Sequence, residues 1–293
     1  MDVSDARDRT TGSESRVRLL AGLPVVERLL DIGGISTPLL EGGEGPPVVL
    51  LHGIGSFSLE WSLVIPRLVR KARVIVPDLP GLGDSDARGR RLDAATLTGW
   101  LLELIERTCV EKPTLVGHSM GGSVAAHFAI RHSDRLRRIV LIDSSSLGRF
   151  RPAPGLIVAL IRFGARPSPA SRARFLRQVL ADPEQARVSW GDRWTALEAY
   201  DLEQAVDKSV SRANGQLMRR IGTRRVPSDQ LNMIGVPVSL IWGKKDRLMR
   251  YRIAEEASSR FGWPLNGFDD CGHGPQIERS DQLADALEAT MGS

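Results

Sequence analysis

A serine lies between two glycines in the stretch "TLVGHSMGGSVAAH", residues 114–127, after an apolar run and before a run of small residues. The spacing Gly117-x-Ser119-x-Gly121 is typical of a sharp turn from a strand into a helix, where bulk at either glycine would clash. Such a turn can present Ser119 as a nucleophile for acyl transfer. The competing interpretation is an ordinary glycine-rich turn, and the residues that could assist a serine decide between the two.

A serine hydroxyl is a weak nucleophile, so it needs a base that takes its proton and an acid that fixes the tautomer of that base. His273, in "CGHGPQIE", follows the last predicted strand and lies between two glycines, and we predict that it is the base. Asp246, in "WGKKD", follows the strand before that one and is predicted to be the acid. Asp143, in "LIDSSS", also follows a strand and stays open as an alternative acid.

These side chains need a framework that brings them together. Short β-rich apolar runs alternate with helical patterns along most of the chain, which predicts an α/β fold with a mostly parallel, doubly wound sheet. The first two runs are expected to form a hairpin that turns near Gly33 and Gly34. Loops at the carboxyl ends of parallel strands meet at one edge of a sheet, so we expect Ser119, Asp246 and His273 there.

The alternation stops between residues 147 and 232, where the sequence is helical in pattern, rich in arginine and without a convincing strand. We predict that this segment is an inserted helical cap and that residues 21–146 and 233–293 form the core. Residues 1–20 mix acidic and basic side chains, and we predict a flexible N-terminal tail there.

With these motifs in place, the chain resembles the α/β-hydrolase superfamily, in its cap-bearing, carboxylesterase- or lactonase-like branch. The resemblance covers roughly residues 25–290 and rests on five motifs in family order, "LLHGIG", "PDLPGLGDSD", "GHSMGG", "LIWGKKD" and "GHGPQIE". It implies the same nucleophile, acid and base. It also implies an oxyanion hole formed by the backbone N–H groups of Ile54 and Met120.

The resemblance implies a serine hydrolase that cleaves small to medium carboxylic esters or lactones through an acyl-enzyme on Ser119. A serine in place of an aspartate argues against dehalogenase and epoxide hydrolase chemistry. Carbon–carbon hydrolysis of vinylogous diketones stays open, although related enzymes often have an aromatic residue where this chain has Gly274. A cofactor-free perhydrolase and a non-catalytic ligand receptor of the same fold are further alternatives.

Substrate choice is expected to depend on the cap. The segment "GLIVALIRFGA", residues 155–165, is either a lid over an apolar acyl pocket or a helix packed on the core. Trp190 and Trp194 either line the pocket or hold the cap helices together. Cap arginines such as Arg149 and Arg162 would attract a carboxylate-bearing substrate, but a solvated arginine-rich face is the favoured explanation.

The net charge and the lengths of the apolar runs indicate which kinds of partner to expect. The net charge is +5, but the basic side chains are mostly arginines scattered among acids, so we expect no nucleic-acid partner. No apolar run reaches the roughly 20 residues of a spanning helix, and the N-terminus lacks the apolar core of a secretory signal. We therefore expect no stable membrane insertion and a cytoplasmic location. The motifs require no metal and no cofactor, the two cysteines are expected to be reduced, and a homodimer stays open.

Overall fold

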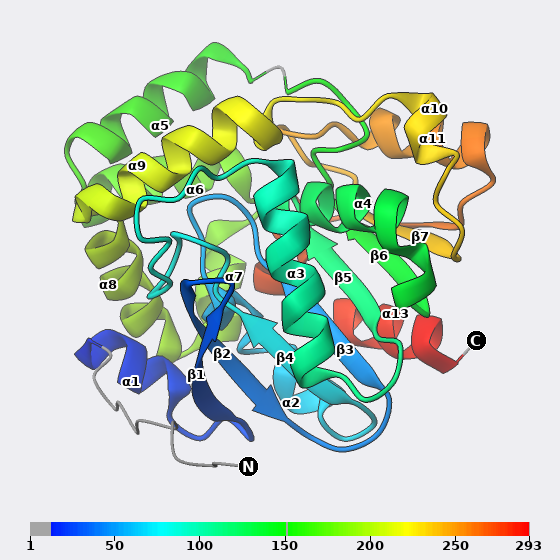
Figure 1. Ribbon diagram of the computed structural model, residues 1–293. Helices are drawn as coiled ribbons and strands as arrows, with labels where there is room; N and C mark the ends of the chain where they lie inside the picture. Colours follow the sequence, from blue (N-terminus) through cyan, green and yellow to red (C-terminus); the bar gives the residue numbers. More distant parts are fainter. Residues whose placement is uncertain (1–12, 151, 293) are drawn as a thin grey trace, which may run out of the picture.

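The computed structural model describes residues 13–150 and 152–292, and its centre is one eight-stranded sheet (Figure 1). The strand order is β1-β2-β4-β3-β5-β6-β7-β8. β1 and β2 form an antiparallel hairpin, β2 pairs antiparallel with β4, and every later pair is parallel. The strands are β1 (Val26–Ile32), β2 (Ile35–Gly42), β3 (Pro47–Leu51), β4 (Arg73–Pro77), β5 (Thr114–His118), β6 (Arg138–Ile142), β7 (Val238–Gly243) and β8 (Leu265–Phe268). The predicted fold class is confirmed.

The hairpin turns where the sequence predicts it. Ile32 pairs with Ile35, so only Gly33 and Gly34 connect the two strands, and both have positive φ angles, 57° and 77°. A two-residue connection of this kind requires the left-handed region at both positions, which glycine enters without a steric penalty.

The parallel strands are apolar on both faces because helices cover both sides of the sheet. Along β3, Val49 and Leu51 belong to one core cluster, while Val48 and Leu50 belong to the other. The first cluster includes residues of α3 (Ala94–Thr108), α4 (Met120–His132) and α11 (Tyr251–Phe261). The second includes residues of α2 (Ile65–Leu68) and α13 (Ser280–Gly292). Figure 1 shows α3 and α4 in front of the sheet and α13 behind it.

Between β6 and β7 the described residues form helices and no strand. We call residues 147–232 the helical insertion. Its helices gather beyond one end of the sheet (Figure 1). They are α5 (Pro154–Ala165), α6 (Pro169–Val179), α7 (Pro183–Trp190), α8 (Arg193–Val206), α9 (Lys208–Leu217), the π-helical turn η3 (Met218–Gly222) and α10 (Ser228–Leu231).

The prediction of a flexible tail over residues 1–20 is wrong for its last part, and residues 1–12 lie outside the described residues. Helix α1 (Glu14–Leu20) packs on α8, with Leu19 in the core. Arg16 on this helix is only 1 % exposed, and its guanidinium lies 2.5 Å from Glu27, 3.3 Å from Asp78 and 3.2 Å from Asp84. A charged side chain can therefore be buried here because acidic side chains from β1 and from the loop after β4 surround the cation.

None of the described helices is long and apolar enough to cross a membrane.

Candidate active site

Ser119 lies on the sharp turn between β5 and α4. Its backbone has φ 52° and ψ −114°, a conformation that costs energy for any residue with a Cβ and that is characteristic of a nucleophile elbow. The flanking glycines make the turn possible. A Cβ on Gly117 would overlap the carbonyl group of Gly121, and a Cβ on Gly121 would overlap that of His52. The Ser119 N–H donates to the Ile142 carbonyl at 2.8 Å, which fixes the turn against β6.

Ser119, His273 and Asp246 form one chain of hydrogen bonds. His273 Nε2 lies 2.9 Å from Ser119 Oγ, and its Nδ1 lies 2.7 Å from Asp246 Oδ2. All three residues are buried. An acid on Nδ1 holds the proton there, so that Nε2 is free to accept the serine proton. The structure thus brings together the three residues that the sequence singles out.

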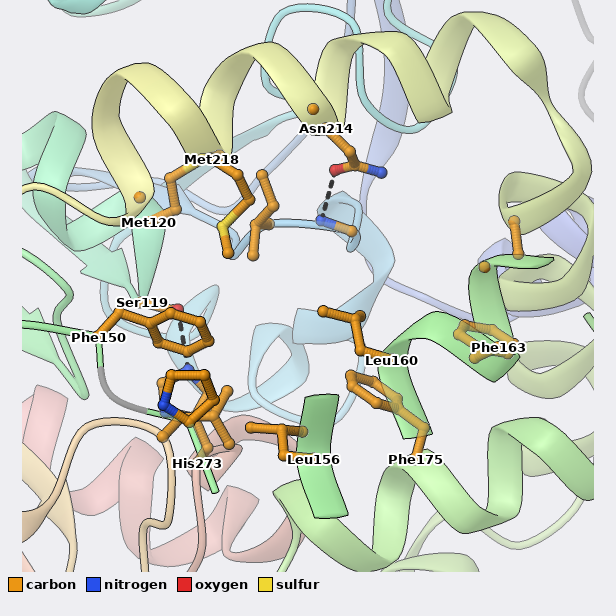
Figure 2. A pocket seen from close by; sticks show the side chains of 18 of the residues that line it. Ser119, Met120, Phe150, Leu156, Leu160, Phe163, Phe175, Asn214, Met218 and His273 are labelled. Carbon is orange, nitrogen blue, oxygen red and sulfur yellow. Dashed lines mark hydrogen bonds between the residues drawn. The ribbon is translucent and has the colours of Figure 1, made fainter. Parts of the chain in front are cut away.

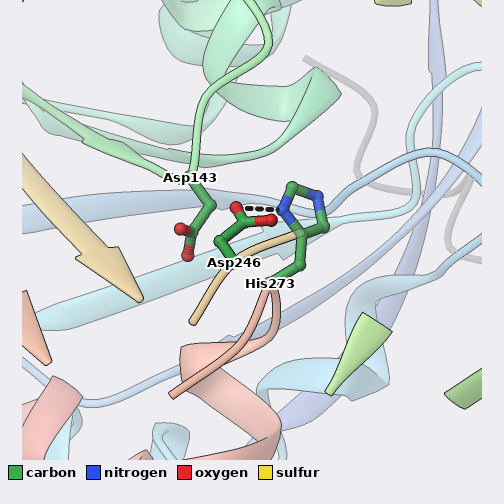
Figure 3. Close-up of side chains that lie close together, drawn as sticks. All are labelled: Asp143, Asp246 and His273. Carbon is green, nitrogen blue, oxygen red and sulfur yellow. Dashed lines mark hydrogen bonds and ion pairs between the residues drawn. The ribbon is translucent and has the colours of Figure 1, made fainter. Parts of the chain in front are cut away.

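The two candidate acids have different positions. The other oxygen of Asp246, Oδ1, accepts the N–H groups of Leu248 and Met249 at 2.7 and 2.9 Å, which fixes the carboxylate toward His273. Asp143 accepts the Gly243 N–H at 3.0 Å instead, and Figure 3 shows it on the far side of Asp246 from the histidine ring. Burial and the neighbouring Asp246 carboxylate raise the pKa of Asp143 well above its ordinary value. The acid in contact with the histidine is therefore Asp246.

Ligand atoms of Asp143, Asp246 and His273 lie within 4.8 Å of one another, a spacing that also suits a metal ion. A cation between them would have to displace the hydrogen bond from His273 Nδ1 to Asp246. The raised pKa of Asp143 also favours its protonated form, which is a poor ligand. The bond between His273 and Asp246 and the bond from the Gly243 N–H to Asp143 account for the three groups, and the expectation that the site needs no metal or cofactor stays a prediction.

Ile54 and Met120, the predicted oxyanion-hole residues, line the same cavity as Ser119. Ile54 lies on the loop after β3, and the His52 ring holds this loop. His52 Nδ1 donates to the Gly53 carbonyl at 2.9 Å, and its Nε2 accepts the Leu79 N–H at 2.9 Å. Burial lowers the pKa of His52, which keeps the ring neutral and able to accept at Nε2.

A third contact on this loop was not predicted from the sequence. Asn214, on α9, accepts the Gly55 N–H through Oδ1 at 3.0 Å (Figure 2). The contact joins the helical insertion to the loop beside the nucleophile. No local pattern marks Asn214, because its partner is 159 residues away in the sequence.

A buried polar network beneath the histidine was also missed. His118 Nε2 donates to the His273 carbonyl at 2.6 Å, and the Gln276 side-chain nitrogen lies 3.1 Å from His118 Nδ1. Glu60 lies 3.5 Å from the same Nδ1. Burial raises the pKa of Glu60, but the hydrogen bond and charge of His118 outweigh it, so this pKa lies below its ordinary value. The network fixes the backbone that carries His273.

The triad opens into a cavity of about 560 Å³ between the core and the helical insertion. Ser119, Phe150 and His273 lie at one end of the view in Figure 2, and Phe163 and Phe175 lie at the other. The lining is largely apolar and includes, from the insertion, Phe150, Leu156, Ile157, Leu160, Ile161, Phe163, Phe175, Val210 and Met218. Its polar members away from the triad are Ser145, Asp201, Gln204, Ser211 and Asn214. Helix α5, whose role the sequence left open, therefore faces the cavity.

The suggestion that Trp190 and Trp194 line the pocket is wrong. Trp190 is buried in the second core cluster, and its Nε1 donates to the Ile277 carbonyl at 3.2 Å. The Trp194 ring faces the Arg172 guanidinium, 4.9 Å from the ring centroid. Trp190 therefore attaches the insertion to the core, and Trp194 joins two helices of the insertion, α8 and α6.

Comparison with known proteins agrees with this geometry. The model of the "Alpha/beta hydrolase family" matches residues 48–286. The chain belongs to the alpha/beta hydrolase family. A pimeloyl-[acyl-carrier protein] methyl ester esterase of Aromatoleum aromaticum is 32 % identical over 258 residues, which cover 83 % of this chain and 97 % of that protein. A 2-hydroxymuconate semialdehyde hydrolase of Pseudomonas sp. is 28 % identical over 282 residues, 89 % and 92 % of the two chains.

Among solved structures, a bacterial membrane phospholipase A superimposes with a TM-score of 0.77 at 26 % identity. The match covers 95 % of this chain and 88 % of that one. The proteins similar to this alpha/beta hydrolase thus include hydrolases of esters and of other bonds.

In this alpha/beta hydrolase the loop that carries His273 is attached to the helical insertion. The His273 N–H donates to the Val179 carbonyl at 2.9 Å. The buried Glu278 carboxylate accepts the N–H groups of Gly272, at 2.8 Å, and of Ala181, at 2.6 Å. The position of the histidine therefore depends on the backbone between α6 and α7 as well as on the core.

Proposed function

We propose that this protein is a serine esterase that cleaves small to medium carboxylic esters or lactones, with Ser119 as nucleophile, His273 as base and Asp246 as acid. The observation that carries the proposal is the hydrogen-bonded chain of these three residues at the end of a largely apolar cavity. Such a cavity suits the hydrocarbon part of an acyl group, while the triad at its end suits the carbonyl carbon.

In the first half-reaction His273 Nε2 takes the Ser119 proton as Oγ bonds to the ester carbonyl carbon. The carbonyl oxygen becomes an oxyanion, and we assign its stabilisation to the N–H groups of Ile54 and Met120. The bond to the alcohol oxygen then breaks, and His273 returns the proton to the departing alkoxide. An acyl group remains on Ser119.

In the second half-reaction water attacks the acyl carbon and gives a proton to His273. The bond to Oγ breaks, and the proton returns from His273 to Ser119. The products are a carboxylic acid and an alcohol, and the enzyme is restored. Asp246 keeps its proton acceptor role toward Nδ1 throughout and stabilises the imidazolium that forms in each half.

A carbon–carbon hydrolase is the second candidate, because the similar hydrolase of Pseudomonas sp. is named for 2-hydroxymuconate semialdehyde, which is not an ester. The same nucleophile and base would serve either reaction. Gly274, next to the base, leaves the position after the histidine without a side chain that could pack on such a substrate.

The experiment is labelling by a fluorophosphonate probe together with hydrolysis of p-nitrophenyl acetate, butyrate and octanoate. The wild type is expected to label and to turn over the esters. Ser119→Ala is expected to lose labelling and at least about a thousandfold in kcat/KM, because the nucleophile is gone. Labelling without ester turnover would favour the carbon–carbon substrate or a lactone. An unlabelled wild type would contradict the proposal and favour a ligand receptor.

A further inference from the structure

A second cavity, of about 800 Å³, lies beside the first and is lined by arginines. We call it the arginine groove. Its lining residues are Arg149, Phe150, Thr223, Arg224, Arg225, Pro227, Ser228 and Arg260. They come from the two ends of the helical insertion and from α11, so segments far apart in the sequence bring four guanidinium groups to one hollow.

The guanidinium groups of the groove have no carboxylate partner within the part of the chain that the structure describes. Elsewhere on the surface arginines do pair, as Arg67 does with Asp285 at 2.6 Å. In the groove Arg225 and Arg260 both donate to the hydroxyl of Ser228, at 3.0 and 2.7 Å. Two cations that converge on one neutral oxygen repel each other, and a bound anion would remove that repulsion.

The groove adjoins the acyl cavity. Phe150 lines both hollows, and in Figure 2 its ring lies at the end of the acyl cavity that holds Ser119 and His273. In an ester bound with its carbonyl carbon at Ser119 and its acyl chain along α5, the alcohol part is the group that would extend past Phe150 toward the arginine groove.

We infer that the arginine groove binds a phosphate group on the alcohol part of the ester substrate, an inference that rests on the proposed function. A phosphate dianion offers three acceptor oxygens and two charges, which matches several guanidinium forks better than one carboxylate does. The substrate class is then an acyl ester of a phosphorylated alcohol.

The test uses three octanoyl esters whose alcohols differ in charge: glycerol, glycerate and glycerol 3-phosphate. Wild type is expected to have a kcat/KM at least about tenfold higher for the phosphate ester than for the glycerol ester, mainly through KM. The double variant Arg224→Ala/Arg225→Ala is expected to lose that preference and to keep its rate on octanoyl glycerol. Inorganic phosphate should inhibit hydrolysis of the phosphate ester by the wild type competitively.

The matched control is Arg131→Ala/Arg252→Ala, which removes the same charge from exposed arginines outside the groove. An equal loss in this control would show a general charge effect and overturn the inference. So would an equal rate of wild type on all three esters, or a glycerate ester as good as the phosphate ester.

A binding measurement separates this inference from the proposed function. In Ser119→Ala, calorimetric titration with the intact phosphate ester is expected to show tighter binding than with octanoyl glycerol. Arg224→Ala/Arg225→Ala in the same background should remove the difference. If wild type turns over esters but the two ligands bind equally, the proposed esterase function is supported and the phosphate-binding role of the groove is contradicted. If wild type turns over no ester but the phosphate ester binds more tightly, the groove is supported and the esterase function is contradicted.

Discussion

The two oxygens of Asp246 have different partners: Oδ2 faces His273, and Oδ1 accepts two backbone N–H groups. We expect Asp246→Asn to lower kcat/KM for p-nitrophenyl butyrate by about 10³–10⁴-fold, because an amide N–H in place of the acceptor favours the wrong tautomer of the histidine. Steady-state kinetics on the variant measures the loss. A rate within tenfold of wild type would assign the acid elsewhere.

Asp143 provides the matched control, since it lies beside Asp246 without a hydrogen bond to the histidine. Its native pKa is raised, so its contribution to stability is complete below the unfolded pKa and is lost as the pH rises through the native pKa. Asp143→Asn keeps an acceptor for the Gly243 N–H and cannot ionise. We expect it to retain most of the esterase activity.

The measurement is urea unfolding of both proteins at pH 5 and pH 8. Wild type should lose stability relative to Asp143→Asn between pH 5 and pH 8, by about 1.4 kcal/mol for each pH unit of that interval that lies below the native pKa. Parallel pH dependence of the two proteins would show that Asp143 does not titrate in this range.

The three residues of the triad could be predicted together from the sequence. Each of them follows a strand, and the carboxyl ends of these strands meet at the same edge of the sheet. The sequence could not separate Asp246 from Asp143. They follow two adjacent strands, β7 and β6, and only the folded structure shows which carboxylate contacts the histidine. The catalytic roles of the triad and of the oxyanion-hole residues stay predictions until the variants are measured.

Among the elements, α5 separates the acyl cavity from solvent and is the simplest place to change its length. Leu160 lines the cavity and is 43 % exposed, so a larger side chain can be accommodated at the helix surface. We expect Leu160→Trp to lower kcat/KM for p-nitrophenyl octanoate about tenfold relative to acetate, because the indole takes space from the longer chain.

Val158 supplies the comparison, since it lies on the same helix, is 48 % exposed and does not line the cavity. Val158→Trp should leave the ratio of octanoate to acetate rates unchanged. The measurement is kcat/KM of both variants for p-nitrophenyl esters of increasing acyl chain length. The same change in the octanoate-to-acetate ratio in both variants would mean that acyl chains do not lie along α5.

The helical insertion itself was predictable from its pattern, but the direction of its helices was not. The sequence left two positions open for α5 and also for the tryptophans. Long-range contacts decided each case: Trp190 reaches the Ile277 carbonyl, and Arg172 covers Trp194. Helix α1 was missed for the same reason, since its buried residues, Ser15, Arg16 and Leu19, combine polar and charged side chains with a single apolar one.

Across the whole molecule, Arg16 joins the N-terminal helix, the hairpin, the loop after β4 and the insertion. It contacts Glu27, Asp78 and Asp84, and it donates to the Tyr200 hydroxyl at 3.0 Å. Burial raises the pKa of Asp78, but the charge of Arg16 and the hydrogen bond from the Ser58 N–H outweigh it and hold this pKa below its ordinary value. The ionised Asp78 therefore adds stability above its unfolded pKa, and that stability is lost as the pH falls through the native pKa.

We expect Arg16→Ala to lower the free energy of unfolding by about 3–5 kcal/mol, because it leaves the buried Asp78 carboxylate without its cation. The loss should shrink at acid pH, where this carboxylate takes up a proton. Urea unfolding measures both effects. Arg18→Ala, two residues away and 65 % exposed at its side chain, should change stability by less than about 1 kcal/mol. A similar result for the two variants would refute the buried cluster.

The bonds from Val179 and Ala181 to the histidine loop also bear on how such proteins can be recombined. A chimera that takes only the insertion of a relative would set a foreign backbone against residues 272–278. Such a chimera would have a changed substrate specificity, and its catalytic base, His273, would also be displaced. Shuffling between members of the family should therefore transplant residues 147–232 and 272–278 as one unit, although 39 residues of the core separate them in the chain.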